Sequence, residues 1–325
     1  MTMSTSTSDS ATPLVFGPVP SRRLGRSLGI NNVPPKTCTY ACVYCQVGPS
    51  PAKEVTPRPF HPPTEVAGAV SRRVENLAAT GENIDYLTFV PDGEPTLDAG
   101  LVEEIELLRP LGIKIAVITN ATLLWREDVR ATLQAADWVS VKVDAADEAT
   151  WRHVNHPHEA LQLNRALEGI ATFSQEYAGD LTTETMLVSG INDGAESVER
   201  VAAFIADLNL TISYLSVPTR PPAVPGVRPP STTNLNRAFQ ILAQRLPRVE
   251  LLIGYEGDDF ASTGDPVHDL LSICAVHPMR HSAVQRLLTQ TASDWIVVDS
   301  LLAEGRILEV EFEGHDYYLR PIATP

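Results

Sequence analysis

Short apolar runs alternate with amphipathic stretches along most of the 325-residue chain. The runs show little alternation of apolar and polar positions, which is typical of strands in a parallel sheet covered by helices. We predict strands at residues 27–31, 84–90, 113–119, 138–143, 183–188 and 212–217. Helical patterns lie between them, at residues 65–77, 101–108, 126–135, 160–177 and 195–208. This alternation predicts an α/β fold with right-handed crossovers, built either as a partial barrel or as a doubly wound sheet.

The C-terminal part follows a different pattern. Six prolines within residues 218–230 exclude an ordinary helix or central strand there. A helix at 234–245, an apolar run at 249–253 and an acidic linker at 256–265 follow. Helices at 282–290 and 294–303, with Ser293 as a cap and Gly305 as a stop, precede a hairpin of residues 307–312 and 317–319. We therefore predict a disordered tail over 1–12, an α/β core over 13–255, a linker and helix over 256–275, and a winged-helix-like module over 276–325.

Charge and cysteine content narrow the classes of protein. The formal net charge is −15, so binding to nucleic acid would need a local basic patch, and DNA is not an expected partner. No apolar run approaches the roughly 20 residues of a membrane helix, and the polar N-terminus lacks a secretory pattern. We therefore expect a cytoplasmic protein that does not use a membrane. In such a reducing compartment, clustered cysteines more often bind metal or do redox chemistry than form disulfides.

Three of the four cysteines, Cys38, Cys42 and Cys45, form a C-x3-C-x2-C array. Thiolates are soft ligands that suit iron–sulfur clusters, zinc and copper(I). Three ligands for a four-iron cluster leave one iron open, as a catalytic zinc keeps a free position. The alternative is a structural zinc site completed by Cys274 or a histidine, although zinc sites usually come as pairs of ligands and no second pair is present. Cys274 lies in an apolar helical stretch and is more typical of a buried thiol.

With Tyr44 before its last cysteine, the array resembles the signature of the radical S-adenosylmethionine (SAM) superfamily. The resemblance implies a partial (β/α)6 TIM-like barrel and a [4Fe-4S] cluster on the three cysteines. It also implies that the amino and carboxylate groups of SAM chelate the fourth iron, with Tyr44 near the adenine. In that family the reduced cluster cleaves SAM to a 5′-deoxyadenosyl radical, which abstracts hydrogen from a substrate. Such enzymes need an electron donor such as flavodoxin or ferredoxin.

Motifs at the strand ends extend the resemblance. Asp92-Gly93-Glu94-Pro95 follows the second predicted strand and resembles the family's Gly-Gly-Glu motif, whose backbone carbonyls bind the SAM ammonium, but it departs at Asp92. The resemblance therefore implies cofactor contacts for Gly93, Glu94 and Pro95. Asn120, Lys142 and Asp144 follow the next strands and resemble the family's ribose and methionine contacts. The alternatives are a Pro/Gly turn for the first motif, a turn residue for Asn120 and a helix cap for Asp144.

Residues 16–48, together with Thr-Arg-Pro-Pro at 219–222 and His-Pro-Met-Arg at 277–280, resemble one branch of the superfamily, the Fe–S oxidoreductases near the tRNA wybutosine-synthesis proteins. This region holds a dense basic cluster, Arg22, Arg23 and Arg26, which could bind an anionic substrate, pair with the SAM carboxylate or form ordinary salt bridges. The sequence does not identify the substrate, which could be a small molecule, a peptide or RNA.

Three other functions remain as alternatives. A wybutosine-like reaction on tRNA is disfavoured by the acidic charge and by the lack of a second cysteine cluster. A non-catalytic, metal-binding regulator would read DNA with its winged helix, but residues 294–303 hold two acids and no Lys or Arg. A zinc hydrolase would need ligands at several strand ends, whereas His153, His156 and His158 cluster in what is predicted to be a loop or helix start.

Overall fold

Eight strands form one curled sheet, in which spatial order follows chain order from β1 to β8. The computed structural model describes residues 13–50, 52–254, 257–258 and 260–321, so the predicted tail over 1–12 lies outside the described residues. The strands are β1 (Val15–Ser21), β2 (Gly25–Ile30), β3 (Tyr86–Phe89), β4 (Lys114–Thr119), β5 (Trp138–Lys142), β6 (Asp180–Met186), β7 (Ile212–Ser216) and β8 (Val249–Leu252). Strands β2 to β8 are parallel, and β1 is antiparallel to β2.

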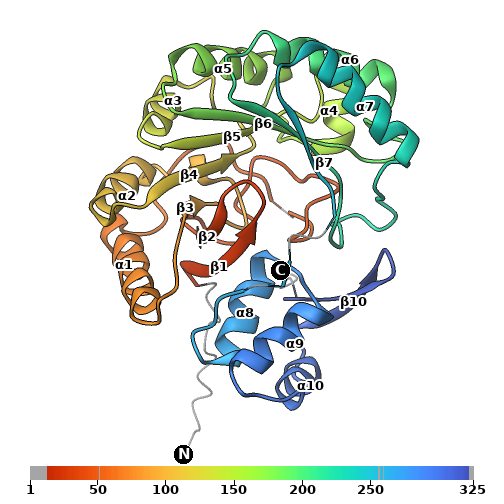
Figure 1. Ribbon diagram of the computed structural model, residues 1–325. Helices are drawn as coiled ribbons and strands as arrows, with labels where there is room; N and C mark the ends of the chain where they lie inside the picture. Colours follow the sequence, from red (N-terminus) through yellow and green to blue (C-terminus); the bar gives the residue numbers. More distant parts are fainter. Residues whose placement is uncertain (1–12, 51, 255–256, 259, 322–325) are drawn as a thin grey trace, which may run out of the picture.

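Helices connect the parallel strands and cover the outer, convex face of the sheet (Figure 1). They are α1 (Pro63–Ala79), α2 (Leu101–Leu108), α3 (Glu127–Leu133), α4 (Glu148–Asn155), α5 (Leu163–Glu176), α6 (Ala195–Ala206) and α7 (Thr232–Arg245). Short 3-10 turns lie at Pro95–Leu97 and Arg109–Leu111. The predicted partial barrel is confirmed. The apolar run predicted at 249–253 forms β8, a seventh parallel strand, and the structure adds the antiparallel β1, which the sequence pattern did not reveal.

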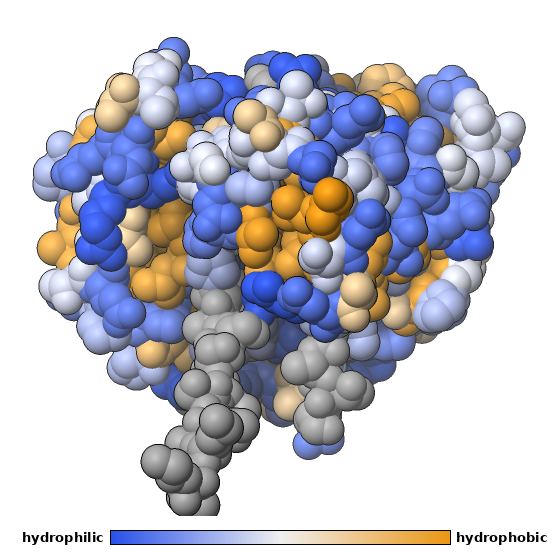
Figure 2. Space-filling model, turned by 90° about the horizontal axis from the view of Figure 1, so that it is seen from below, coloured by the Kyte–Doolittle hydropathy of each residue, from blue (hydrophilic) through white to orange (hydrophobic). Residues whose placement is uncertain are grey.

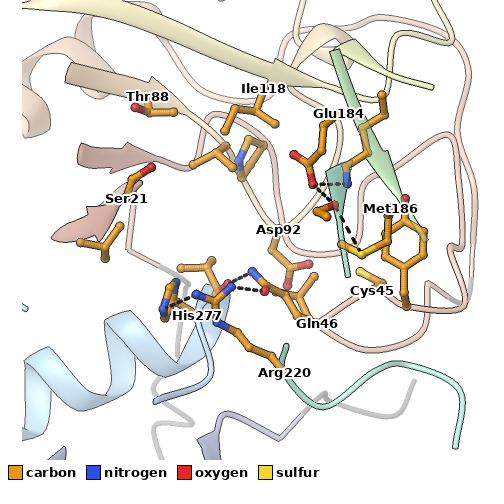
Figure 3. A pocket seen from close by; sticks show the side chains of 18 of the residues that line it. Ser21, Cys45, Gln46, Thr88, Asp92, Ile118, Glu184, Met186, Arg220 and His277 are labelled. Atoms are coloured by element: carbon orange, nitrogen blue, oxygen red, sulfur yellow. Dashed lines mark hydrogen bonds and ion pairs between the residues drawn. The ribbon is translucent and has the colours of Figure 1, made fainter. Parts of the chain in front are cut away.

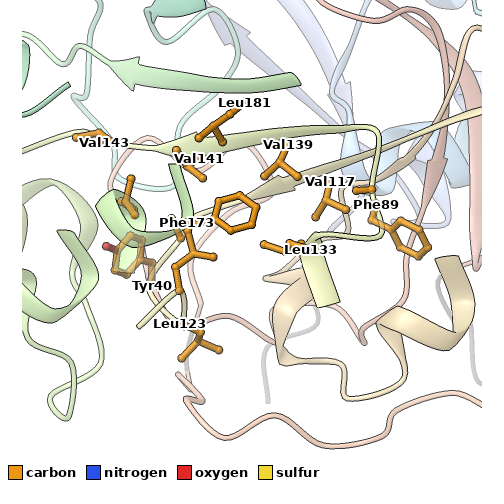
Figure 4. Packing of buried hydrophobic residues seen from close by; sticks show 14 of the residues in the cluster. Tyr40, Phe89, Val117, Leu123, Leu133, Val139, Val141, Val143, Phe173 and Leu181 are labelled. Atoms are coloured by element: carbon orange, nitrogen blue, oxygen red, sulfur yellow. The ribbon is translucent and has the colours of Figure 1, made fainter. Parts of the chain in front are cut away.

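Side chains of each parallel strand alternate between two buried environments. Outward-facing residues pack under the helices, as Figure 4 shows for Val117, Val139, Val141 and Phe89, together with Phe173 of α5. Inward-facing residues alternate with them and include several polar side chains, namely Ser27, Thr88, Ser140, Lys142, Glu184 and Ser216. One side of each strand is apolar, whereas the side that faces the cavity mixes polar and apolar residues. Because both sides are buried, the alternation is weak in the sequence.

A small module follows the barrel. It consists of α8 (Pro266–Val276), β9 (Met279–Arg280), α9 (His281–Gln290), α10 (Ile296–Ala303), β10 (Leu308–Phe312) and β11 (His315–Leu319), with the sheet order β10-β11-β9. The hairpin turns at Glu313 and Gly314, both with positive φ, as a two-residue turn requires. Gly305, with φ of 64°, follows the end of α10 as predicted.

The predicted cap Ser293 does not cap α10. Its hydroxyl donates to the carbonyl of Thr291, and Asp294 Oδ1 accepts the hydrogen bond of the Ile296 N–H at the start of the helix. Helix α8 contributes Leu270, Ile273 and Cys274 to the module's own apolar core. On this packing we infer that α8 belongs to the module rather than to a linker.

The module sits below the barrel in Figure 1, where α8 packs against β1. Seen from that side, apolar side chains gather in patches framed by polar ones (Figure 2). Ile296 on α10 and Leu308 on β10 are 67% and 45% exposed, which makes them the most exposed large apolar residues among those described. The barrel and the module are thus joined by contacts of α8 and β1.

Behind the end of β2, three neighbouring polar side chains are buried: Asn32, Asp98 and Glu104. Asn32 also donates to the carbonyl of Pro95 at 3.2 Å, so the group supports the turn after β3. Burial first, and then the neighbouring Asp98 carboxylate, raise the pKa of Glu104 well above its ordinary value of 4.5. Glu104 therefore keeps a proton that it can donate to Asp98.

We predict that Glu104→Gln flattens the pH dependence of stability. In the wild type, the folded protein holds a proton that the unfolded chain loses near the ordinary carboxyl pKa, so stability falls as pH rises toward the raised pKa, by up to about 1.4 kcal/mol per pH unit. Glutamine keeps a donor to Asp98 but does not titrate. Thermal unfolding of both proteins across about pH 5 to 9 measures the difference, and parallel curves would contradict the shared proton.

Candidate functional site

A cavity of about 330 Å³, within the range of small-molecule sites, lies between the inner face of the barrel, the cysteine loop and the C-terminal module. Its walls include Cys38, Cys42 and Cys45 on one side, inward-facing side chains of β3 to β8, and Val276 and His277 of the module. Figure 3 shows Asp92, Glu184, Met186 and Arg220 around this space. Of the residues predicted from the sequence, the three cysteines, Tyr44, Gly93 and Lys142 line it.

The cysteine loop is held by backbone hydrogen bonds at both ends. The N–H groups of Ala41 and Val43 donate to the carbonyls of Asn155 and Val154 at the end of α4, both at 3.0 Å. The carbonyl of Cys38 accepts from the N–H of Glu54 at 3.0 Å. Because the last carbonyls of a helix have no partner within the helix, α4 offers acceptors that an irregular loop can use. Helix α4 thus fixes the loop between Cys38 and Cys45.

Gly93 allows the turn after β3 to approach this loop. A Cβ at Gly93 would lie 2.2 Å from the carbonyl oxygen of Thr37, and the two residues form a parallel bridge. The N–H of Glu94 donates to the same Thr37 carbonyl at 2.8 Å. The absence of a side chain at Gly93 therefore lets the turn after β3 pack directly against the cysteine loop.

Glu94 and Pro95 are buried outside the cavity. The Glu94 carboxylate accepts hydrogen bonds from the hydroxyls of Thr96 and Thr119, both at 2.6 Å, and from the N–H of Asn120 at 2.7 Å. It therefore ties the end of β3 to the end of β4. Burial raises the pKa of Glu94, and these donors act against that rise.

Two amide side chains point at cysteine sulfurs. Asn120 Nδ2 lies 3.6 Å from Cys38 Sγ, and Asn155 Nδ2 lies 3.4 Å from Cys42 Sγ. Burial raises the pKa of the cysteine thiols, that of Cys42 to about 12, so metal binding must displace their protons. Donors aimed at sulfur stabilise the negative charge that the bound thiolates then carry.

Asp144 joins these groups into a network. One carboxylate oxygen accepts from the Tyr44 hydroxyl and, at 2.7 Å, from Asn155 Nδ2, while the other accepts from the N–H of Met186 at 2.8 Å. Asp144 and Asn120 line a small void beside the main cavity rather than the cavity itself. They are therefore one layer behind Tyr44 and the cysteines.

Sequence reasoning missed a charged group inside the barrel. Glu184 on β6 accepts from Lys142 Nζ at 3.0 Å, from the Ser216 hydroxyl at 2.9 Å and from Arg23 Nη1 at 2.6 Å. Burial favours the neutral form of Glu184, but Lys142 and then Arg23 outweigh it and lower its pKa. Lys142 also lies 5.0 Å from the centre of the Tyr44 ring. An acidic residue within a predicted buried strand was the available signal.

The arginine cluster of the sequence separates in the structure. Arg26 pairs with Glu82 and donates to the carbonyl of Asn83 at the surface, and Arg22 donates to the carbonyl of Ile253. Arg23 pairs with Glu184 inside the barrel, and Arg22 and Arg23 both line the cavity. Arg26 does not line it, so the three side chains do not form one basic patch.

Another hydrogen-bond network joins the cysteine loop to the module. Arg220 Nη1 donates to the Gln46 side chain at 2.8 Å, and Nη2 lies 2.9 Å from His277 Nε2 (Figure 3). Gln46 in turn donates to the carbonyl of Val276 at 3.2 Å. Burial and the adjacent Arg220 lower the pKa of His277 well below its ordinary value, so the ring is neutral and accepts the arginine hydrogen bond. Gln46 follows Cys45 directly, and the module thereby contacts the loop.

The histidines and Cys274 are the alternative metal ligands that the sequence offered. His153 and His156 are exposed at the end of α4, not at a helix start, and the His158 ring accepts from the N–H of Ala160. Cys274 is buried in the module core. Within the described ranges, no three His, Cys, Asp or Glu side chains converge on one point as ligands of a single metal ion do. The thiolates of a four-iron cluster each bind a different iron atom.

Comparison with known proteins gives the family. The Radical SAM superfamily matches residues 32–205. The UPF0026 protein MJ1312 of Methanocaldococcus jannaschii is 42% identical over 313 residues, which cover 96% of this chain and 97% of that protein. A UPF0026 protein of Helicobacter pylori is 31% identical over 285 residues, covering 86% and 89%.

A solved structure agrees in fold. A radical SAM methyltransferase from Sphaerobacter thermophilus superposes with a TM-score of 0.53 at 17% identity, covering 69% of this chain and 66% of that one. TYW1 with a lysine-pyruvate adduct reaches only 0.41 at 12% identity, over 91% of this chain and 80% of that one, a likeness too weak to bear on function. No helix in the described part of the chain is long and apolar enough to cross a membrane. The chain belongs to the radical SAM superfamily and, within it, to the UPF0026 family, and it is an enzyme that uses a [4Fe-4S] cluster and SAM.

Proposed function

We propose that Cys38, Cys42 and Cys45 hold the [4Fe-4S] cluster at the wall of the barrel cavity and that SAM binds beside it. The observation that carries this assignment is the position of all three thiols on one cavity, in a loop fixed by α4 and by the Gly93 turn. When bound, the reduced cluster supplies the electron that cleaves SAM to methionine and a 5′-deoxyadenosyl radical. The protein's task is to orient SAM and exclude water.

Several residues fit that task by their contacts. Tyr44 is fixed by Asp144 and can present its ring to an adenine, and Lys142 carries a positive charge suited to the methionyl carboxylate. Gly93 lines the cavity and can offer its backbone carbonyl to the ammonium group. Glu94, Asn120 and Asp144 act by positioning these groups, because their side chains are hydrogen-bonded within the protein. Pro95 acts in the same way through its backbone carbonyl, which accepts a hydrogen bond from Asn32.

The electron donor and the substrate belong to the proposal as well. A radical SAM enzyme needs a reductant, and we infer a flavodoxin or ferredoxin of the cytoplasm, where the thiols stay reduced. We place the chain near the wybutosine-synthesis branch on the sequence of residues 16–48. A tRNA substrate is disfavoured because the exposed face of the module holds Asp294, Asp299, Glu309 and Glu311.

We predict that Cys42→Ala abolishes cluster assembly, whereas Cys274→Ala, the matched thiol in the module core, does not. Loss of one of three ligands exposes the cluster to loss of iron, while Cys274 only packs. Iron and sulfide content after anaerobic reconstitution measures the effect, together with the change that SAM causes in the electron paramagnetic resonance spectrum of the reduced cluster. Equal iron content in both variants, or one tightly bound zinc in the wild type, would contradict the assignment.

We predict that Asn155→Leu lowers the reduction potential of the cluster by tens of millivolts, the size expected for losing one hydrogen bond to a charged group. The amide N–H stabilises charge on the Cys42 sulfur, and the reduced cluster carries more negative charge. A redox titration followed by electron paramagnetic resonance measures the potential. Asn234→Leu on α7 serves as the control, and the same potential in Asn155→Leu and the wild type would refute the role of Asn155.

A further inference from the structure

The turn between β1 and β2 lies at the end of the barrel where the parallel strands begin. Leu24 of this turn packs in an apolar cluster with Trp138 and Tyr214, and the side chain of Arg23 lies beside the same two rings. The Arg23 guanidinium lies 5.9 Å from the ring centres of both Trp138 and Tyr214, and its side chain is only 15% exposed. The sequence therefore places a buried cation at the end of the barrel where the parallel strands begin.

The Arg23 guanidinium has both a bonded and an unpartnered N–H group among the described residues. Nη1 donates to Glu184 at 2.6 Å. Nε is buried and, among the described residues, has no hydrogen-bond partner. A buried N–H of a charged group without a partner is costly, so its persistence calls for an acceptor that the folded chain does not itself supply.

The chemistry of that acceptor follows from the donor. The Nε and Nη2 edge of a guanidinium presents two parallel N–H groups, which match the oxygens of a carboxylate or phosphate. Glu184 does not cancel the positive charge alone, because it is shared with Lys142. Hydroxyl groups of Ser21, Ser27 and Thr88 line the same cavity and can add neutral hydrogen bonds.

Side-chain distances place this edge beside the residues proposed for SAM. Arg23 Nη1 and Lys142 Nζ contact the same Glu184 carboxylate, at 2.6 and 3.0 Å. Lys142 Nζ in turn lies 5.0 Å from the centre of the Tyr44 ring. An anion bound to Arg23 therefore lies next to Lys142, in the same cavity as the cysteines.

We propose that Arg23 anchors the substrate by a carboxylate or phosphate group, so that the substrate is a small organic anion held beside Lys142. This inference rests on the proposed function of the cavity and adds to it the class of substrate. Arg23 is the specificity-determining residue in this account. Glu184 and Lys142 keep the guanidinium in place.

Binding of simple anions tests the proposal. The cluster-loaded protein is titrated anaerobically with inorganic phosphate and, in a parallel arm, with acetate, at constant ionic strength, by isothermal calorimetry. Arg23→Gln is compared with Arg26→Gln, which removes the same charge from the same segment but on the surface. We expect Arg23→Gln to weaken binding of the preferred anion on the order of tenfold to a hundredfold, and Arg26→Gln to leave it unchanged. Arg23→Lys keeps the charge without the paired donors and should bind with intermediate affinity.

The outcomes separate this inference from the cluster assignment. Iron content and the spectral response to SAM show in each variant whether the cluster site is intact. Anion binding to the wild type must persist when SAM is saturating. Displacement of the anion by SAM, equal binding in Arg23→Gln and the wild type, or no binding of either anion to the wild type would each overturn the role of Arg23, while leaving the cysteine assignment standing.

Discussion

The backbone pairing that holds the cysteine loop is the constraint on which the rest of the site depends. The loop has no regular secondary structure of its own, yet three thiols must be presented on one cavity. The carbonyls at the end of α4 and the Gly93 turn supply that order from two sides. The Gly93 turn follows the carboxyl end of β3, and α4 follows β5, so the loop is held by elements that are attached to the sheet. Asn120, which follows β4, and Asn155, the last residue of α4, point at the cysteine sulfurs.

The parallel sheet also gives the barrel a polar interior, which is enclosed by an apolar layer of side chains under the helices. Alternate residues of each strand face the helices or the cavity, and the parallel register lines up the inward positions of neighbouring strands. Lys142, Glu184 and Ser216 meet in this way from three adjacent strands. A buried carboxylate shared by two cations is stable only when all its partners are fixed, so the charge network also rigidifies the barrel interior.

Much of the fold could be predicted from the sequence, because apolar runs and helical periodicity are local signals. The strands β2 to β7 and most helices lie within a few residues of the predicted ranges. The spacing of the three cysteines was enough to predict the class of enzyme. The missing parts depend on long-range contacts. Strand β1 is recognisable only by its pairing with β2, and Arg23 and Arg220 gain their roles from partners more than 50 residues away. The cofactor contact of Gly93 stays a prediction, and its close contact with Thr37 could not be named without the structure.

The central claim is that this chain performs radical SAM chemistry at the cavity bordered by Cys38, Cys42 and Cys45. The most direct measurement is the formation of 5′-deoxyadenosine by the anaerobically reconstituted protein, given dithionite and SAM and analysed by chromatography, with Cys42→Ala alongside. The account predicts 5′-deoxyadenosine from the wild type and none from the variant. Intact SAM after incubation with a wild-type protein that carries a full cluster would contradict it.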